Sequence, residues 1–173
     1  MRLIRHLQRE RKDPSFLADF DLKKTCFQGQ LKKITKSSRN LLLVFFCIKR
    51  YFDLKSKASQ LKDLAAQNKI VPRIIFVGGI SRPGDKLHLM QIKFIINVTQ
   101  VLEQDPDTNK YLRLVFLPNY STSKEYLYVP ALDVNEQLTI PGKQACTTQP
   151  LKFVMNGSIL IGSRDATNIR IEK

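Results

Sequence analysis

The spacing of apolar and polar positions divides the chain into two parts. From Ser38 to Phe52, apolar residues recur at helical spacing with basic residues on the other side, and Leu54 to Lys69 continues this period. These patterns predict that the first sixty or so residues are mainly helical. At Pro72 the pattern changes, because Ile74 to Val77 is an unbroken apolar run of the kind found in strands buried on both faces.

After this boundary, helical and strand-like segments alternate. A helical stretch from Lys86 to Glu103 precedes a second buried-strand pattern, Leu112 to Leu117, so these segments predict a βαβ unit. Two further short strands are expected at Val129 to Leu132 and Ser158 to Ile161, with a helix or turn around Leu151 to Asn156. We therefore predict an α/β fold, a partial Rossmann-like open parallel sheet preceded by helices.

Composition limits the size of the fold and suggests a class of partner. A chain of 173 residues, 43% of them apolar, can bury one ordinary core. Its 29 basic and 15 acidic residues give a formal net charge of +14, which attracts polyanions. Nucleic acid is therefore a candidate partner, although the basic cluster Lys32, Lys33, Lys36 and Arg39 lacks the interleaved aromatic residues of a stacking platform.

Cysteine spacing and the longest apolar run point to an intracellular protein. Cys26, Cys47 and Cys146 are odd in number, widely spaced and without a C-x-x-C pattern, so they suggest neither a disulfide framework nor a zinc site. The run from Leu41 to Ile48 is shorter than the roughly 20 residues that a membrane-spanning helix needs. We expect a cytoplasmic protein with no metal site and no membrane segment.

The beginning of the chain is basic. Residues 1–26 are expected to form a basic helical segment that precedes a domain at residues 27–173. A mitochondrial presequence has a similar basic, amphipathic start, but Glu10 and Asp13 follow quickly and no serine-rich stretch accompanies them. A solvated basic helix is therefore the favoured interpretation.

Ligands of open α/β sheets collect where the strands end, so the loops there are the first places to look for chemistry. These loops are Gly78 to Lys86, Pro118 to Lys124 and Pro141 to Lys152. No nucleotide-binding glycine motif occurs in the chain, and His6 and His88 stand far apart without a carboxylate pattern around them. Neither nucleotide binding nor histidine catalysis therefore has direct support from a motif.

Lysines are the remaining candidates for chemistry. Lys152 stands between a polar loop and an apolar stretch, where an amine can become a Schiff-base nucleophile. A lysine in this setting is more often a surface residue whose stem covers apolar neighbours. Lys32 and Lys33 could hold a phosphate group or simply solvate an exposed face, and composition favours solvation.

Three stretches resemble the glycogen (α-1,4-glucan) phosphorylase family. Val71 to Gly84 is similar to that family's V-P-R-x-x-x-x-G-G-x-x-x-P-G. Asp105-Pro106 and Leu112 to Tyr120 are similar to D-P…L-R-V-I-F-L-E-N-Y, and Leu151 to Asn168 resembles M-K-F-M-L-N-G-A-L-T-I-G-T-x-D-G-A-N. The order and spacing hold without a gap from Phe27 to Asn168, about four-fifths of the chain.

The resemblance implies a fold, a reaction and a set of site residues. The fold is part of the C-terminal half of a GT-B glycosyltransferase, and the family reaction is phosphorolysis of α-1,4-glucan to glucose 1-phosphate. Lys152 falls at the position that carries pyridoxal 5′-phosphate, Tyr120 on a tyrosine near this cofactor, and Thr148 on a threonine of its phosphate-cradling loop. Lys32 and Lys33, the candidate catalytic residues, fall on a paired K-R that supplies positive charge near the phosphates.

Other positions depart from the family pattern. The family's E-A-S-G-T-G-N-M-K reads here as Gln144 to Lys152, in which both glycines are gone and Pro150 removes an N–H donor. Ser38 and Ser121 replace a lysine and an arginine, and Gln144 replaces a sugar-binding glutamate. We therefore expect a phosphorylase-like chain that is inactive alone.

Two other interpretations stay open at this point. The chain is part of a longer, functional phosphorylase, or it is a basic module that binds nucleic acid or another polyanion. Under the leading interpretation, glucan and inorganic phosphate are the ligands that the resemblance implies. A second copy of the chain or a full-length phosphorylase is then the expected protein partner.

Overall fold

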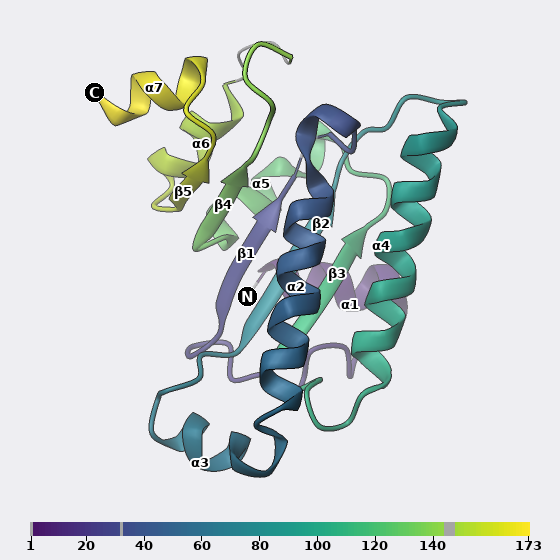
Figure 1. The fold of residues 1–173 in the computed structure, drawn as a ribbon, viewed down its shortest axis with the longest axis vertical. Coiled ribbons are helices and arrows are strands. Elements are labelled where there is room, and N and C mark those ends of the chain that lie inside the picture. The colour runs from purple at the N-terminus through teal and green to yellow at the C-terminus, as the bar shows by residue number, and fades with distance from the viewer. Residues whose placement is uncertain (1, 32, 144–147) are drawn as a thin grey trace.

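An open sheet of parallel strands forms the centre of the protein (Figure 1). The computed structural model describes residues 2–31, 33–143 and 148–173. The strands are β1 (Cys26–Gln30), β2 (Arg73–Gly78), β3 (Leu112–Leu117), β4 (Val134–Gln137) and β5 (Ile159–Gly162). They lie in the order β3-β2-β1-β4-β5, and every pair of neighbours is parallel. This confirms the predicted open parallel α/β sheet, in which the strand order reverses direction beside β1.

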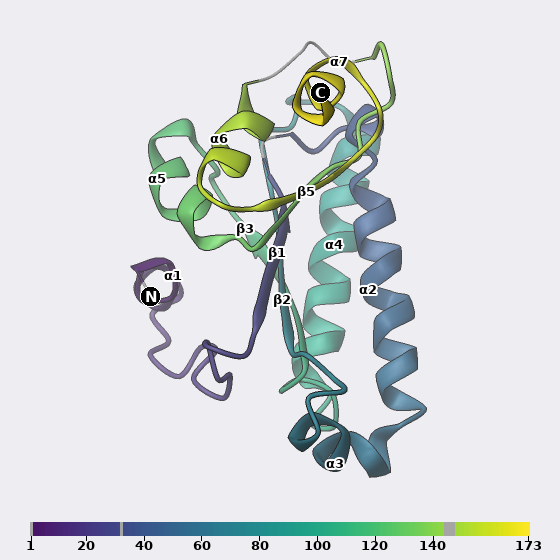
Figure 2. The same ribbon diagram turned by 90° about the vertical axis from the view of Figure 1, so that its left-hand side faces the viewer.

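Helices cover both faces of the sheet (Figure 2). One face carries α2 (Asn40–Lys55) and α4 (Lys86–Gln104), and the other carries α1 (Arg2–Arg11), α5 (Glu125–Tyr128) and α6 (Gln149–Met155). The short helices α3 (Leu61–Ala66) and α7 (Ala166–Glu172) precede β2 and follow β5. α4 begins at a side-chain cap, because the Asp85 carboxylate accepts hydrogen bonds from the N–H groups of Leu87 and His88.

Two cores sit on the two faces, and β2 contributes to both. Ile74 and Phe76 pack toward α1, whereas Ile75 and Val77 pack toward α2 and α4. All four side chains are 0% exposed. Alternate side chains of a strand point to opposite faces, which is why a strand covered on both sides is an unbroken apolar run in the sequence.

The central strand β1 contradicts the helical expectation for the first sixty or so residues. Its sequence, Cys26 to Gln30, is largely polar, but Gln28 and Gln30 are buried and hydrogen-bonded within the fold. Gly29 is required by close packing, because a Cβ there would lie 2.8 Å from Leu132 Cδ1 and 3.2 Å from the Phe76 carbonyl oxygen. Tertiary contacts therefore make a strand from a segment without a strand pattern.

One other element prediction is wrong, and a second is confirmed only in part. Val129 to Leu132 is not a strand, because Val129–Ala131 forms a 3-10 turn after α5 and the strand begins only at Val134. The expected helix from Leu54 to Lys69 is reduced to α3 and the 3-10 turn Ala58–Gln60. The remaining predicted elements are confirmed within a few residues: the helices around residues 38–52, 86–103 and 151–156, and the strands around 74–77, 112–117 and 158–161.

The basic N-terminal segment shares a core with the sheet. Leu3, Ile4 and Leu7 on one face of α1 join a cluster that includes Phe16 and Phe20. The apolar face of α1 is therefore buried, and its arginines face outward. The domain boundary after residue 26 stays a prediction from the sequence.

Candidate functional site

Lys152 lies in α6, the helix that leads from the carboxyl end of β4 to β5. Phe153 anchors this helix in the core and is 0% exposed, whereas the Lys152 side chain is 48% exposed. The Lys152 ammonium does not simply point into solvent, because its Nζ donates to Glu125 Oε2 at 2.7 Å. An ion pair therefore joins α6 to α5.

Glu125 is the centre of a small polar cluster. Its side chain is only 11% exposed, and its Oε1 accepts a hydrogen bond from the Tyr120 hydroxyl at 3.1 Å. The same hydroxyl accepts from Gln149 Nε2 at 3.2 Å. We call Tyr120, Glu125, Gln149 and Lys152 the α5–α6 cluster, because α5 and α6 supply three of its four residues.

Tyr120 is held as a neutral donor in this cluster. Its ring is buried and stacks on Tyr128, with 5.9 Å between the ring centroids. Burial, followed by the neighbouring Glu125 carboxylate, raises the pKa of Tyr120 well above its ordinary value. The hydroxyl therefore stays protonated and donates a hydrogen bond to Glu125.

In the described part of the chain, the side chains of the other predicted site residues make no hydrogen bond with the α5–α6 cluster. Lys33 prolongs β1 through a single bridge to Ile80 and is half-buried. Thr148 is exposed, and its carbonyl accepts from the Lys152 backbone N–H at 3.2 Å, while its side chain makes no capping bond to α6. Lys32 and the loop residues 144–147 lie outside the described residues. The structure thus brings Lys152 and Tyr120 together through Glu125.

Arg39 joins the loops that follow β4 and β5. Its guanidinium donates to the carbonyls of Leu138 and Thr139 after β4, and to the Ser163 hydroxyl after β5. Ser38, which stands where the resemblance puts a lysine, is buried, and its carbonyl accepts from Gln30 Nε2 at 2.6 Å. Oxygen atoms of the chain itself thus accept hydrogen bonds from Nε and Nη2 of Arg39.

The fit of pyridoxal phosphate can be tested on these contacts. The cofactor needs an amine for its aldehyde and donors for its phosphate. Lys152 supplies the amine, but Glu125 already accepts from both Lys152 and Tyr120. Pro150 offers no N–H in the first turn of α6, and the Glu125 carboxylate repels a phosphate placed beside Lys152. The described residues therefore do not form a site for the cofactor phosphate.

Sequence reasoning missed Glu125 and the partner role of Gln149. Glu125 follows a serine-rich loop, and nothing in its local pattern distinguishes it from a solvated acidic residue. Gln149 stands in the stretch Gln144 to Lys152 that departs from the family pattern, and nothing around it in the sequence indicates its partner. Both residues reach Tyr120 only because α5 and α6 pack close together, and their spacing in the sequence does not predict this packing.

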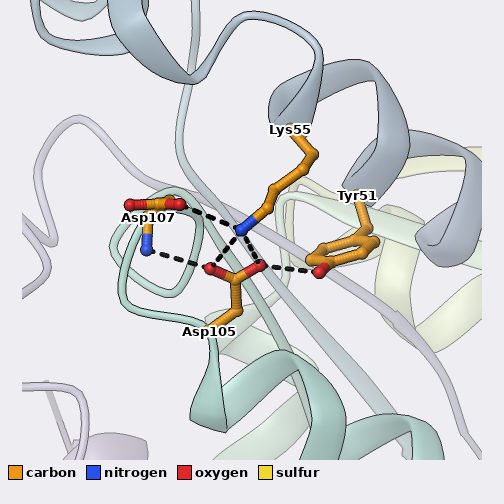
Figure 3. Close-up of polar contacts among 4 residues, drawn as sticks. All are labelled: Tyr51, Lys55, Asp105 and Asp107. Carbon is orange, nitrogen blue, oxygen red and sulfur yellow. Dashed lines mark hydrogen bonds and ion pairs between the residues drawn. The ribbon is translucent and has the colours of Figure 1, made fainter.

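A second polar cluster lies at the C-terminal end of α2 (Figure 3). Lys55 Nζ lies 2.9 Å from Asp105 Oδ2 and 2.9 Å from Asp107 Oδ2, and the Tyr51 hydroxyl donates to Asp105 Oδ2 at 2.6 Å. We call these four residues the Asp105 cluster. It joins the end of α2 to the loop between α4 and β3, so its role is structural.

Residues 2–31, 33–143 and 148–173, which the structure describes, contain neither a metal-binding cluster nor a membrane-spanning helix. Within these ranges, no group of three or more His, Cys, Asp and Glu side chains is placed to hold a metal ion. No helix in the same ranges is long and apolar enough to cross a bilayer.

The fold is therefore a parallel α/β sheet with a lysine-bearing helix beside its switch of strand order, and comparison with known proteins identifies its family. Residues 16–173 match the family model described as Phosphorylase: Carbohydrate phosphorylase. The chain belongs to the carbohydrate phosphorylase family, which is pyridoxal-phosphate-dependent.

The relatives are much longer than this chain. Glycogen phosphorylase 2 of Dictyostelium discoideum is 34% identical over 145 residues, which is 84% of this chain and 14% of that protein. Glycogen phosphorylase of Saccharomyces cerevisiae is 31% identical over 174 residues, or 100% of this chain and 19% of the yeast protein. The human liver form is 33% identical over 145 residues, 84% of this chain and 16% of that protein. The chain spans less than a fifth of each of these three relatives.

Proposed function

We propose that this chain is a phosphorylase-family domain that does not catalyse phosphorolysis by itself. The observation that carries the proposal is the ion pair between Lys152 and buried Glu125. In the family resemblance Lys152 is the cofactor lysine, but here its ammonium and the nearby Tyr120 hydroxyl both donate to a carboxylate of the same chain. Among the described residues, the lysine is retained with a carboxylate beside it, where a cofactor phosphate would need donors.

The positions of Lys33 and Arg39 also support the loss of activity. Lys33, a candidate for holding substrate phosphate, makes no hydrogen bond or ion pair with Lys152, Tyr120 or Thr148 in the part of the chain that the structure describes. Arg39, beside β1, donates to protein carbonyls and a serine hydroxyl. Lys33 thus shares no hydrogen bond or ion pair with these residues of the described chain, and part of the Arg39 guanidinium is already hydrogen-bonded within the protein.

Purified protein, pyridoxal 5′-phosphate and borohydride provide the test. We expect no stoichiometric adduct at Lys152 and no glucose 1-phosphate from glycogen and inorganic phosphate. A stoichiometric Lys152 adduct together with glucose 1-phosphate formation contradicts the proposal. A thermal melt with and without the cofactor adds an independent reading, because a ligand that binds only the folded form raises the midpoint.

The proposal also covers architecture and partners. We place the domain in the C-terminal half of a GT-B arrangement and in the cytoplasm, where the glucan-phosphorolysing relatives would be its natural partners. Pairing with a full-length phosphorylase or with a second copy is the expected assembly. Size-exclusion chromatography of the chain alone and mixed with a glycogen phosphorylase measures both kinds of association.

Polyanion binding is a second candidate function, favoured by one side of α1. Arg5, Arg9 and Lys12 are exposed, line a shallow pocket with Gln8 and Pro14, and have no carboxylate within ion-pair distance among the described side chains. The apolar side of α1 is buried in the core, so this surface offers positive charge without an apolar face for a membrane. Such a surface suits the phosphates of a nucleic acid.

Salt dependence of binding to a labelled DNA duplex tests this candidate. The double variant Arg5→Gln/Arg9→Gln should lower the slope of log affinity against log salt by roughly 2, because each phosphate contact contributes about 0.9. The double variant Lys62→Gln/Lys69→Gln removes the same charge from exposed positions around α3 and should leave the slope nearly unchanged. Equal slopes in all three proteins would exclude α1 as a nucleic-acid surface.

A further inference from the structure

Glu125 sits where an external anion would otherwise meet the donors of the α5–α6 cluster. Its two carboxylate oxygens accept from different groups, Oε2 from the Lys152 ammonium at 2.7 Å and Oε1 from the Tyr120 hydroxyl at 3.1 Å. We infer that Glu125 is a built-in counter-ion that shields the Lys152 amine from aldehydes, and that its removal restores this reactivity. The inference rests on the proposed loss of the cofactor role of Lys152.

The chemistry of the amine explains how Glu125 acts. Attack on an aldehyde uses the nitrogen lone pair, which forms a bond to the carbonyl carbon, and water then leaves with the carbonyl oxygen. An ammonium that donates to a carboxylate has no lone pair for this bond. Because the Lys152 side chain is 48% exposed, a small aldehyde can reach it from solvent. Access therefore does not limit the reaction, and the paired carboxylate does.

The surroundings of Glu125 keep it in place. It begins α5, its side chain is 11% exposed, and it is bound by a tyrosine that Gln149 and the stacked ring of Tyr128 hold in turn. Turning the carboxylate away would leave the Tyr120 hydroxyl without its acceptor inside the protein. The pair is thus a fixed part of the packing between α5 and α6.

The sign of the Glu125 charge adds a preference between aldehydes. An aldehyde that carries a phosphate brings negative charge toward a buried carboxylate, whereas a neutral aldehyde does not. The wild-type protein should therefore discriminate against pyridoxal 5′-phosphate relative to pyridoxal at Lys152. Loss of the Glu125 charge should weaken this discrimination.

The experiment compares wild type with Glu125→Gln, which keeps the shape of the side chain and an acceptor for Tyr120. Each folded protein is treated with pyridoxal or pyridoxal 5′-phosphate and with borohydride, whose hydride reduces the carbon–nitrogen double bond to a stable adduct. Peptide mass spectrometry then gives the initial rate at every lysine. We expect labelling of Lys152 by pyridoxal to rise about fivefold, as for loss of one partly exposed ion pair, and labelling by the phosphate ester to rise more.

The reciprocal control is Glu10→Gln, which breaks the ion pair of Lys124 with Glu10. It should raise labelling of Lys124 and leave labelling of Lys152 unchanged. Glu125→Gln should raise labelling of Lys152 and leave labelling of Lys124 unchanged. An unchanged Lys152 rate in folded Glu125→Gln overturns the inference, and so does an equal rise at all lysines in both variants. If Glu125→Gln does not fold, high salt should raise Lys152 labelling in wild type, and no rise overturns the inference.

The two proposals fail in different ways. Glucose 1-phosphate formation by the wild-type chain would refute the proposed loss of function, whatever the labelling rates are. The pyridoxal arm measures only the amine and its neighbour, so it decides the role of Glu125 separately. If pyridoxal labels Glu125→Gln faster than wild type but the phosphate ester does not bind, the result supports the counter-ion role of Glu125. It leaves the proposed loss of phosphorolysis to its own test.

Discussion

The hydroxyl of Tyr51 donates a hydrogen bond to the carboxylate of Asp105 at 2.6 Å, and this contact joins α2 to the loop that follows α4 (Figure 3). Lys55 completes the junction, with Nζ at 3.0 Å and 2.9 Å from the two oxygens of Asp105. The hydrogen bond from Tyr51, followed by the contacts with Lys55 and the Asp107 N–H, lowers the pKa of Asp105 to about 2. The junction is thus strongest when Asp105 is ionised.

Stability in acid should therefore depend on Asp105. A carboxyl whose folded-state pKa lies below its ordinary 3.8 stabilises the protein fully above that value, and the contribution is lost as the pH falls toward about 2. Asp105→Asn should lower the free energy of unfolding by about 2 kcal/mol at neutral pH, and the difference from wild type should shrink over this acid range. Urea titrations at several pH values measure it.

Tyr51→Phe is the matched control for Asp105→Asn. It removes the largest cause of the low pKa while the carboxylate remains, so the acid-sensitive range should move to higher pH. If wild type and Asp105→Asn differ by the same amount at pH 7 and in strong acid, the Asp105 cluster does not carry this pH dependence.

Glu136 should show the opposite dependence on pH. It is buried beside Gln28, whose Nε2 donates to it, and burial raises its pKa above the ordinary 4.5 despite Gln28 and Arg73. The folded state thus favours the neutral carboxyl, so stability is present below pH 4.5 and is lost as the pH rises through the raised pKa. Glu136→Gln should gain about 1 kcal/mol relative to wild type at neutral pH.

Parallel denaturant titrations of wild type and Glu136→Gln from acid to neutral pH check this sign. The gain of the variant should grow with pH, since the glutamine cannot ionise and still accepts from Gln28. A variant that becomes relatively less stable as the pH rises would show that the positive charge of Arg73 compensates the ionised Glu136.

Two neighbouring residues of α6 should respond very differently to truncation. Phe153 is 0% exposed within the core that α1 shares with the sheet, so Phe153→Ala should cost about 3–5 kcal/mol of unfolding free energy. Met155 is 86% exposed, and Met155→Ala should change stability by less than about 0.5 kcal/mol. Comparable costs in urea titrations would mean that α6 does not pack on the sheet as described.

Cys47 should be protected from alkylation in the native protein. It is 0% exposed in α2, and burial raises its pKa far above the ordinary value, so little thiolate is available to react. Iodoacetamide should modify Cys47 roughly 100-fold or more slowly than in denaturant, because reaction requires opening of the core. Peptide mass spectrometry separates it from half-buried Cys26. Rapid modification of Cys47 without unfolding would contradict the packing of α2 on the sheet.

The elements that the sequence predicted well are those whose pattern of apolar and polar side chains matches the surfaces that they bury. β2 and β3 are apolar along their length because both faces are covered, and α4 has a clear helical period after the Asp85 cap. β1 could not be recognised in this way, since Gln28 and Gln30 meet their partners only after β4 and residues 35–38 fold against it. The strand expected at Val129 likewise became a 3-10 turn beside α5.

For the candidate site, the sequence by itself determined the family resemblance, Lys152, Tyr120 and the loss of glycines before α6. The order of residues preserves such a motif whatever its members touch. Only the tertiary structure decided what the lysine does, because α5 and α6 meet only when both pack on the sheet. That packing places the Glu125 carboxylate 2.7 Å from the Lys152 amine, across 27 positions of sequence. An ion pair depends on distance in space, and the chain order does not contain that distance.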